Sequence, residues 1–398
     1  MGSTSDPRSP DAEAARILST CLRGEAWAES DLRHLIERES PDLFRVLAEG
    51  LSDRFDPRLS EAYAGIFARV IAAVLPEYEP AKLIERYARV RRPRRYVRED
   101  PRTVYVLSRV TLGADVAITA VILDGMKRRF PASRIVFAGP EKNFELFSAD
   151  SRIEHLPVPY GSGGSLRDRI GICPELAGPG SIVIDPDSRL TQLGLLPVCP
   201  EENYYFFDSR AWGGDGAESL GCLTRRWLRD SFEIDGARAY IAPREQPRAA
   251  AEITVSLGVG GNPAKLVPPP FEALLLEALS HRGGVIVDAG AGGEEAGRVA
   301  RAIGVAPVRT WRGSFAGFAS IIARSRLYIG YDSAGQHVAA ACGVPLVAVF
   351  AGAPCERFRQ RWRPSGPGRI EVVRADAAGA ASVLEQTLEA AGRVTIAA

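Results

Sequence analysis

From Thr103 onward, short apolar runs alternate with segments of helical periodicity, and this alternation constrains the fold more than any other feature. The strand candidates are TVYVLSR, RIVFAG and SIVID in a first series, and EITVSLG, GVIVDAG, RLYIGYD and PLVAVFAG in a second. Helical patterns such as DVAITAVILDGMKRRF and PFEALLLEALSHR stand between them. Because these strands are apolar along their length, they predict parallel sheets covered on both faces, which is an α/β fold.

The two series are separated by a loop-rich stretch at 209–250, which predicts two doubly wound domains facing each other across a cleft. We place the first Rossmann-like domain at residues 96–245 and the second at residues 246–398. In such sheets, ligands bind beyond the carboxyl ends of the strands. All the candidate residues described below follow a strand, so we expect the functional site in the cleft.

Residues 1–95 carry amphipathic helical patterns and no chemical motif, so we expect a helical appendage that docks or dimerises. The segment 86–102 contains eight arginines. It is interpreted either as a solvated linker or as a contact with anionic lipid, where each basic residue contributes about 1 kcal/mol.

Composition excludes several classes of protein. The net charge of +1 over 398 residues gives no electrostatic reason to expect a nucleic-acid partner. No apolar run reaches the roughly 18–20 residues that span a bilayer, and the first residues lack the apolar core of a secretory signal. Six scattered cysteines without a C-x-x-C pair suit reduced thiols, so we expect a cytoplasmic protein.

The sequence YDSAGQH, residues 331–337, joins a strand candidate to an alanine-rich helix. Asp332 lies just past the strand and Ser333 is a plausible N-cap of the helix. The free N–H groups of Ala334 and Gly335, with the partial positive charge of a helix N-terminus, can hold a phosphate oxygen. Equally, Asp332 and Ser333 can simply cap the helix while His337 forms a local hydrogen bond. The local sequence favours neither interpretation.

Lys265 follows a glycine-rich turn after EITVSLG and is one of only four lysines in an arginine-dominated chain. A compact, flexible ammonium suits phosphate oxygens that shift as a bond breaks. The alternative is a solvated surface lysine.

Two further carboxylate positions follow strands. Arg109 closes the first strand and Asp115 opens the next helix, where it can act as an N-cap or as a general base. Glu294 and Glu295 begin a helix of the second series. They are favourable there against the helix dipole and could also accept hydrogen bonds from ribose hydroxyls.

Taken together, four stretches over roughly residues 100–390 resemble glycosyltransferase family 9, the ADP-heptose:lipopolysaccharide heptosyltransferases. The family's basic residue and Gly-Asp six positions later correspond to Arg109 and Asp115, with the glycine at 113. Its Lys-x-Trp-Pro corresponds to KLVP at 265–268, without the tryptophan. Its Asp-(Ser/Thr)-Gly-x-x-His corresponds to DSAGQH at 332–337, with the glycine displaced by one, and GVPLVAVFAG follows.

The resemblance implies a GT-B architecture, with the nucleotide-sugar donor mainly on the second domain, the acceptor mainly on the first, and neither metal nor other cofactor. It implies inverting transfer: Asp115 would take the proton of the acceptor hydroxyl as that oxygen attacks the anomeric carbon. Lys265, Ser333 and the N–H groups of Ala334 and Gly335 would neutralise charge on the leaving diphosphate.

The resemblance also implies the remaining roles. Asp332 and Glu294 would approach the donor sugar or ribose, ADP-heptose is the first candidate donor, and the acceptor would be a glycan or lipid-linked molecule. The loop DPDSR has the letters of an Asp-x-Asp metal motif but falls in the acceptor domain. It is interpreted as part of an acceptor-facing loop, and the possible acceptor or support residues are Arg109, His337, Asp185 and Arg189.

Two alternatives remain open. A GT-B-fold epimerase or hydrolase would turn over the donor without an acceptor. A non-catalytic relative would bind a nucleotide sugar without turnover, while residues 1–95 bind a partner.

Overall fold

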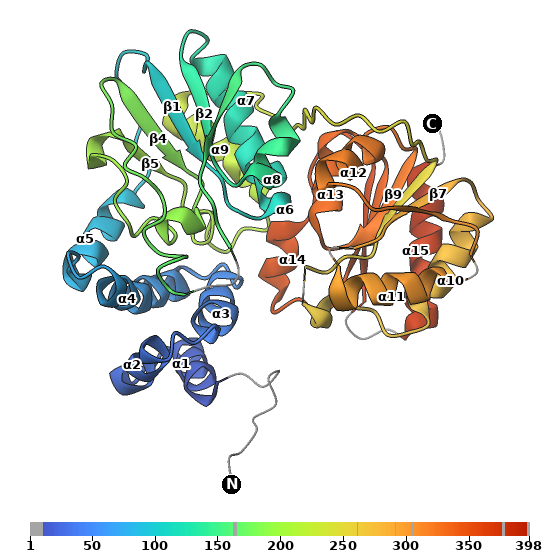
Figure 1. Cartoon of the computed structure of the whole chain (residues 1–398), viewed down its shortest axis with the longest axis horizontal. Helices are drawn as coiled ribbons and strands as arrows, with labels where there is room; N and C mark the ends of the chain where they lie inside the picture. Colours follow the sequence, from blue (N-terminus) through green and yellow to red (C-terminus); the bar gives the residue numbers. More distant parts are fainter. Residues whose placement is uncertain are drawn as a thin grey trace.

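Two parallel β-sheets, one in each half of the chain, form the framework of the computed structural model (Figure 1). The structure describes residues 11–161, 165–260, 262–290, 292–304, 306–375 and 379–395. The first sheet has the strand order β3-β2-β1-β4-β5 and the second β11-β10-β9-β6-β7-β8. All the strand pairs are parallel, so the predicted α/β fold with two Rossmann-like domains is confirmed.

The strands of the first sheet are β1 (Thr103–Leu107), β2 (Arg134–Gly139), β3 (Ile153–Pro157), β4 (Ser181–Asp185) and β5 (Tyr204–Phe206). Those of the second are β6 (Ile253–Ser256), β7 (Val285–Asp288), β8 (Arg309–Trp311), β9 (Leu327–Tyr331), β10 (Leu346–Phe350) and β11 (Ile370–Arg374).

The helices before β6 are α1 (Ala12–Arg23), α2 (Glu29–Glu37), η1 (Leu43–Ala48), α3 (Glu49–Ser52), α4 (Pro57–Val74), α5 (Pro80–Val90), α6 (Leu112–Ala114), η2 (Asp115–Thr119), α7 (Ala120–Arg129), α8 (Glu141–Phe144), η3 (Glu145–Phe147), η4 (Arg189–Thr191), η5 (Glu201–Asn203) and α9 (Leu220–Phe232). Those after it are η6 (Pro263–Lys265), α10 (Phe271–Ser280), α11 (Gly293–Ile303), α12 (Phe315–Ile322), α13 (Ala334–Ala341), α14 (Glu356–Trp362) and α15 (Ala380–Thr395).

One hydrophobic core runs through both domains. In the first domain it lies between α7, α9 and one face of the sheet, with Val106 and Trp227 among its members. In the second it lies between α12, α13 and the facing strands, with Phe318 and Val338 among its members. Because these side chains form one continuous cluster, the two domains are in direct apolar contact. The opposite face of the second sheet packs against α10 and α15 in a core of its own.

The N-terminal helices form a layer of the first domain rather than a separate unit. The apolar stripe of α4, which includes Phe67 and Ile71, belongs to the same core as Leu107 and Val183 on the strands. Figure 1 shows α4 and α5 beside the β4–β5 side of this sheet. The structure therefore corrects the interpretation of residues 1–95 as an appendage with no part in the core.

Deleting residues 1–95 is expected to give an insoluble or unfolded protein, because the deletion uncovers one apolar face of the first sheet. Soluble yield and circular dichroism of the truncated chain, set beside the full-length protein, measure this. A soluble, cooperatively folded product would restore the view that these residues only dock on a complete domain.

The arginine-rich segment is bound to the first domain. The Arg86 guanidinium lies 4.6 Å from the centre of the Tyr204 ring, and Arg91 forms an ion pair of 2.9 Å with Asp208. Arg94 donates hydrogen bonds to three backbone carbonyls near β5. These three guanidinium groups are bound to groups of the protein itself. Their contacts therefore do not support the interpretation of a membrane contact. None of the helices among the described residues has the length and apolar character needed to cross a bilayer.

Candidate active site between the two domains

Lys265 lies at the carboxyl end of β9, where the phosphate interpretation requires it. Its Nζ atom donates to Asp332 Oδ2 at 2.8 Å and to the Asp332 carbonyl oxygen at 3.2 Å. Ser333 and the start of α13 follow directly, so the ammonium and the helix N-terminus share one location. The lysine is not a free cation, however, because Asp332 is its ion-pair partner.

Local structure holds this lysine in place. The side chain of Asn262 accepts a hydrogen bond from Ala264 N at 3.1 Å and caps the short helix η6 that ends at Lys265. The Nζ atom also lies 5.5 Å from the centre of the Phe358 ring on α14, a cation–π distance. Elements that follow β6, β9 and β10 therefore converge on one ammonium.

The first turn of α13 is tied to the same carboxylate. Gln336 Nε2 donates to Asp332 Oδ1 at 2.6 Å, so Asp332 receives hydrogen bonds from both sides. His337 is buried beside Trp362, with 5.9 Å between the ring centres. Burial lowers the pKa of His337 to about 4, with Asp332 raising it and Lys265 lowering it further. The imidazole is therefore neutral at pH 7 and adds no positive charge to the site.

Asp115 is saturated with hydrogen bonds. Its carboxylate accepts from Ser108 Oγ, Thr119 Oγ1 and Asn143 Nδ2 at 2.6 Å each, and from Arg109 N at 2.7 Å. It is fully buried, and burial raises its pKa, although these four donors lower it. A carboxylate has about four lone-pair sites. In this arrangement none is left for an acceptor hydroxyl. The carboxylate fixes the β1–α6 loop, and its role as a general base stays a prediction.

Arg109 links β1 to the loop that follows β4. Its Nη1 donates to the Pro186 carbonyl at 2.8 Å and to Ser209 Oγ, and lies 3.6 Å from Asp187 Oδ2. Arg210 forms a closer ion pair with Asp187, at 2.5 Å. The prediction that Arg109 and the DPDSR loop share a site is consistent with these contacts. With its guanidinium 3 % exposed, Arg109 holds the loop rather than facing the cleft.

Backbone strain gathers at the same edge of the first sheet. Val110, directly after Arg109, has a φ of +62°, and Asp187 has a φ of +70°. A β-branched residue in this region is an outlier, and such strain persists only where the surrounding contacts enforce it.

The two remaining candidates on this loop have different surroundings. Asp185 is fully buried and accepts hydrogen bonds from Ser188 N, Thr191 Oγ1 and Tyr204 OH. Its carboxylate holds the turn, which fits the support role of the prediction and not the acceptor-facing one. Arg189 is only partly buried, and its Nη1 atom has no hydrogen-bond partner among the described residues. That nitrogen is itself buried, so it is an unsatisfied donor inside the first domain.

On the second domain, Glu294 is exposed in the first turn of α11. Its neighbour Glu295 faces the loop after β6, where its Oε2 accepts from Val259 N at 3.0 Å. The ribose role predicted for Glu294 stays a prediction, and Glu295 is the carboxylate that contacts the glycine-rich loop.

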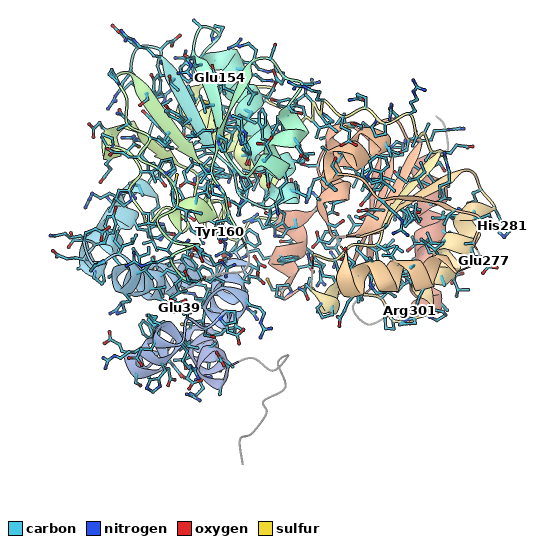
Figure 2. The ribbon with its side chains drawn as sticks, in the orientation of Figure 1. Glu39, Glu154, Tyr160, Glu277, His281 and Arg301 are labelled. Atoms are coloured by element: carbon cyan, nitrogen blue, oxygen red, sulfur yellow. The ribbon has the colours of Figure 1, made fainter. Side chains whose placement is uncertain are left out.

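The described residues contain no group of three or more histidine, cysteine or acidic side chains that could hold a metal ion. His281, for example, stands at the outer edge of the second domain (Figure 2). Metal independence stays a prediction.

Solved structures share this two-domain arrangement. The glycosyl transferase family 9 protein from Veillonella parvula has a TM-score of 0.55 at 18% identity, covering 74% of this chain and 97% of that one. The structure of E. coli heptosyltransferase WaaC with ADP-2-deoxy-2-fluoro heptose has a TM-score of 0.51 at 16% identity, covering 72% of this chain and 99% of that one. The structure of the same enzyme with ADP has a TM-score of 0.52 at 15% identity, covering 73% of this chain and 100% of that one. About a quarter of this chain thus has no counterpart in these structures. A comparison of the chain with curated proteins found no match.

Residues 273–387, which lie within the second domain, match glycosyltransferase family 9 (heptosyltransferase). The resemblance to glycosyltransferase family 9 is confirmed. The GT-B architecture is confirmed with it, and the family match supports glycosyltransferase activity.

The two glycines that are displaced from the family 9 pattern are explained by close contacts. A Cβ atom on Gly113 would lie 3.1 Å from Ala334 Cα, so α6 rests directly on the start of α13. A Cβ atom on Gly335 would lie 2.3 Å from the hydroxyl of Tyr328 on β9, so a side chain is excluded there. The first contact also covers the N–H end of α13.

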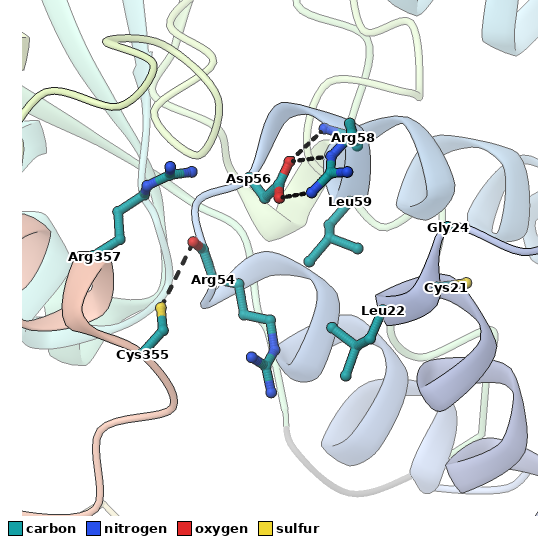
Figure 3. A pocket seen from close by; sticks show the side chains of 9 residues that line it. All are labelled: Cys21, Leu22, Gly24, Arg54, Asp56, Arg58, Leu59, Cys355 and Arg357. Carbon is teal, nitrogen blue, oxygen red and sulfur yellow. Dashed lines mark hydrogen bonds and ion pairs between the residues drawn. The ribbon is translucent and has the colours of Figure 1, made fainter.

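Sequence reasoning missed the contact between the N-terminal region and the second domain. A cavity of about 320 Å³ lies between this region and the second domain, and Arg54, Arg58 and Arg357 are among the residues that line it (Figure 3). Cys355 Sγ contacts the Arg54 carbonyl at 3.8 Å across it.

Proposed function

We propose that the protein is an inverting, metal-independent glycosyltransferase that moves a sugar from a nucleotide-diphosphate donor to a hydroxyl of a glycan or lipid-linked acceptor. A nucleotide-sugar glycosyltransferase is the class that the family match supports. The observation that carries the proposal is the position of Lys265, whose ammonium lies against the residue that precedes the N-cap of α13. The E. coli relative was solved with ADP and with an ADP-heptose analogue, which makes an ADP-sugar the first donor to test.

The proposed chemistry assigns a step to each group. The donor diphosphate displaces Asp332 from Lys265, and the lysine then neutralises the charge that grows on the leaving group. Asp332 is released toward the donor sugar. The acceptor oxygen attacks the anomeric carbon from the face opposite the diphosphate, which inverts the configuration. A lysine and a helix N-terminus supply the positive charge that a metal would otherwise supply.

Binding requires the domains to separate at the α6–α13 contact, because Gly113 covers the helix end that would receive the diphosphate. Closure onto the bound donor then excludes water from the reacting bond. This order of events favours transfer to an acceptor over simple hydrolysis.

The test is a thermal-shift screen with ADP-, UDP-, GDP- and dTDP-sugars, because a ligand that binds the native state raises apparent stability by mass action. The donors that bind are then incubated with acceptor-containing lysate, with and without EDTA, and release of nucleoside diphosphate is measured. Acceptor-dependent release that EDTA leaves unchanged is expected. Release without acceptor would indicate an epimerase or hydrolase, and binding without turnover would indicate a non-catalytic relative.

A further inference from the structure

The phenol of Tyr328 places a polar group in the apolar core beside α13. Tyr328 lies in β9, its side chain has no exposed surface, and it belongs to the same core as Val338 and Ala339 of α13. Its hydroxyl has no hydrogen-bond partner among the described residues. A buried polar group without a partner is destabilising, and a phenylalanine ring would fill the same core without that cost. The hydroxyl therefore calls for a role outside the stability of the fold.

Two glycines make room for this hydroxyl at the turn from β9 to α13. A Cβ atom on Gly330 would lie 2.5 Å from the Tyr328 hydroxyl oxygen, and a Cβ atom on Gly335 would lie closer still. Gly330 is in the last turn of chain before the strand ends, and Gly335 is the second residue of α13. The hydroxyl thus contacts both ends of the turn. The chain has its glycine at 335, where the phenol requires it.

Ser333, which lies within this turn, carries a second hydroxyl without a partner. It occupies the N-cap position of α13 with an extended backbone, but its side chain accepts no hydrogen bond from the helix. Its Oγ atom is buried and has no partner in the described part of the chain. Burial raises the pKa of Tyr328, and Ser333 is the first of the neighbours that lower it, which agrees with two hydroxyls enclosed in the same turn.

A serine that stands at the N-cap without capping leaves donors of the first helical turn free. A capping hydroxyl would accept a hydrogen bond from the N–H group of Gly335 or Gln336, the second and third residues of α13. An anion at a helix N-terminus binds the same kind of N–H group. Capping by Ser333 and binding of a diphosphate therefore compete for the same donors.

Resting on the proposed function, we propose that Tyr328 is a positioning residue for the donor diphosphate. When the diphosphate binds, the Tyr328 hydroxyl donates a hydrogen bond to Ser333 Oγ, and the Ser333 hydroxyl donates to a diphosphate oxygen. This chain of two hydrogen bonds holds the serine off the capping position, so the N–H groups of Gly335 and Gln336 stay free for the same anion. Both buried hydroxyls gain partners in the bound state.

The experiment compares Tyr328→Phe with the full-length wild type by calorimetric titration with ADP, UDP, GDP and dTDP. For the diphosphate that the wild type binds, the dissociation constant is expected to rise about 10-fold, the effect of one lost hydrogen bond. The Tm without ligand is expected to rise by about 1–3 °C, because the variant loses an unpaired buried hydroxyl and its Ser333 is free to cap α13. Binding and stability thus change in opposite directions, which a hydroxyl that only supports the fold would not produce.

Tyr240→Phe is the matched control. The Tyr240 hydroxyl donates to Asp150 Oδ2 at 2.8 Å in the first domain, so this variant loses a hydroxyl that has a partner. Its Tm should fall, and its affinity for the diphosphate should equal that of the wild type.

A double-mutant cycle tests whether Tyr328 acts through Ser333. Ser333→Ala removes the hydroxyl that would contact the diphosphate, so it should weaken binding on its own. In the Ser333→Ala background, Tyr328→Phe should weaken binding no further. Additive losses would overturn the proposed action through Ser333.

The remaining outcomes separate this inference from the proposed function. Affinity that Tyr328→Phe leaves unchanged, in a wild type that binds a nucleoside diphosphate, would overturn the role of Tyr328 alone. A lower Tm of Tyr328→Phe together with weaker binding would also overturn it, because the hydroxyl would then support the fold. A wild type that binds none of the four diphosphates and transfers from none of the donors would overturn both proposals.

Discussion

Lys265→Ala is expected to slow sugar transfer by on the order of 10²-fold and to weaken donor binding, because the variant loses the ammonium that stabilises the leaving diphosphate. The lysine touches Asp332 on both its carbonyl and its carboxylate, so its removal also leaves that carboxylate with Gln336 as its remaining donor. An uncompensated negative charge would then stand where the diphosphate binds. Both effects act in the same direction.

Steady-state kinetics and a donor titration measure this prediction. Lys82→Ala is the control, because Lys82 is another of the four lysines and pairs with Glu79 on an exposed surface. A Lys265→Arg variant should recover part of the donor affinity, since it keeps the charge but presents it on a planar group of different reach. Kinetics unchanged by Lys265→Ala would show that the Lys265–Asp332 pair only holds the β9–α13 turn.

The fold could be predicted from the sequence where strands are central in a sheet. All seven predicted strands exist, and each has a neighbour on both sides. The four strands that were not predicted, β3, β5, β8 and β11, are the four edges of the two sheets. Three of them, β3, β8 and β11, are partly exposed, and β5, although buried, has only three residues. They therefore lack the continuous apolar run that identified the others.

The role of residues 1–95 could not be predicted, because an amphipathic stripe shows that a helix is buried on one side but not what covers it. The stripe of α4 was visible in the sequence. That it packs on strands of the first sheet follows from tertiary contacts more than 30 residues away in the chain. The same packing carries Phe55 to the second domain, which is why this contact was missed.

The candidate site shows a similar division. Residues that follow neighbouring strands were placed correctly relative to each other, because parallel strands end at one edge of a sheet. Lys265 and Asp332 meet for that reason. The complete set of partners of each carboxylate was not predictable, since one partner of each comes from a distant position. Asn143, which bonds Asp115, is 28 residues away, and Tyr204, which bonds Asp185, is 19 residues away.

Asp115→Asn is expected to lower the free energy of unfolding by about 3 kcal/mol, because it disrupts a fully buried carboxylate that accepts four hydrogen bonds. An amide has one acceptor oxygen in place of two, and its NH₂ group would face donors such as Asn143 Nδ2. At least one buried donor is left without a partner. Urea denaturation measures the change, and Asp100→Asn, at an exposed ion pair with Arg129, should change stability by less than about 0.5 kcal/mol.

The same variant tests whether Asp115 is the base. If Asp115 fixes the β1–α6 loop, Asp115→Asn loses stability, and at temperatures where it is folded its pH–rate profile keeps the acidic limb of the wild type. A variant that keeps full stability and donor affinity while its rate falls at least about 10²-fold would instead make Asp115 the base. Its hydrogen-bond partners would then have to release it during turnover, and because all four lie in the first domain, parting of the domains alone would not do so.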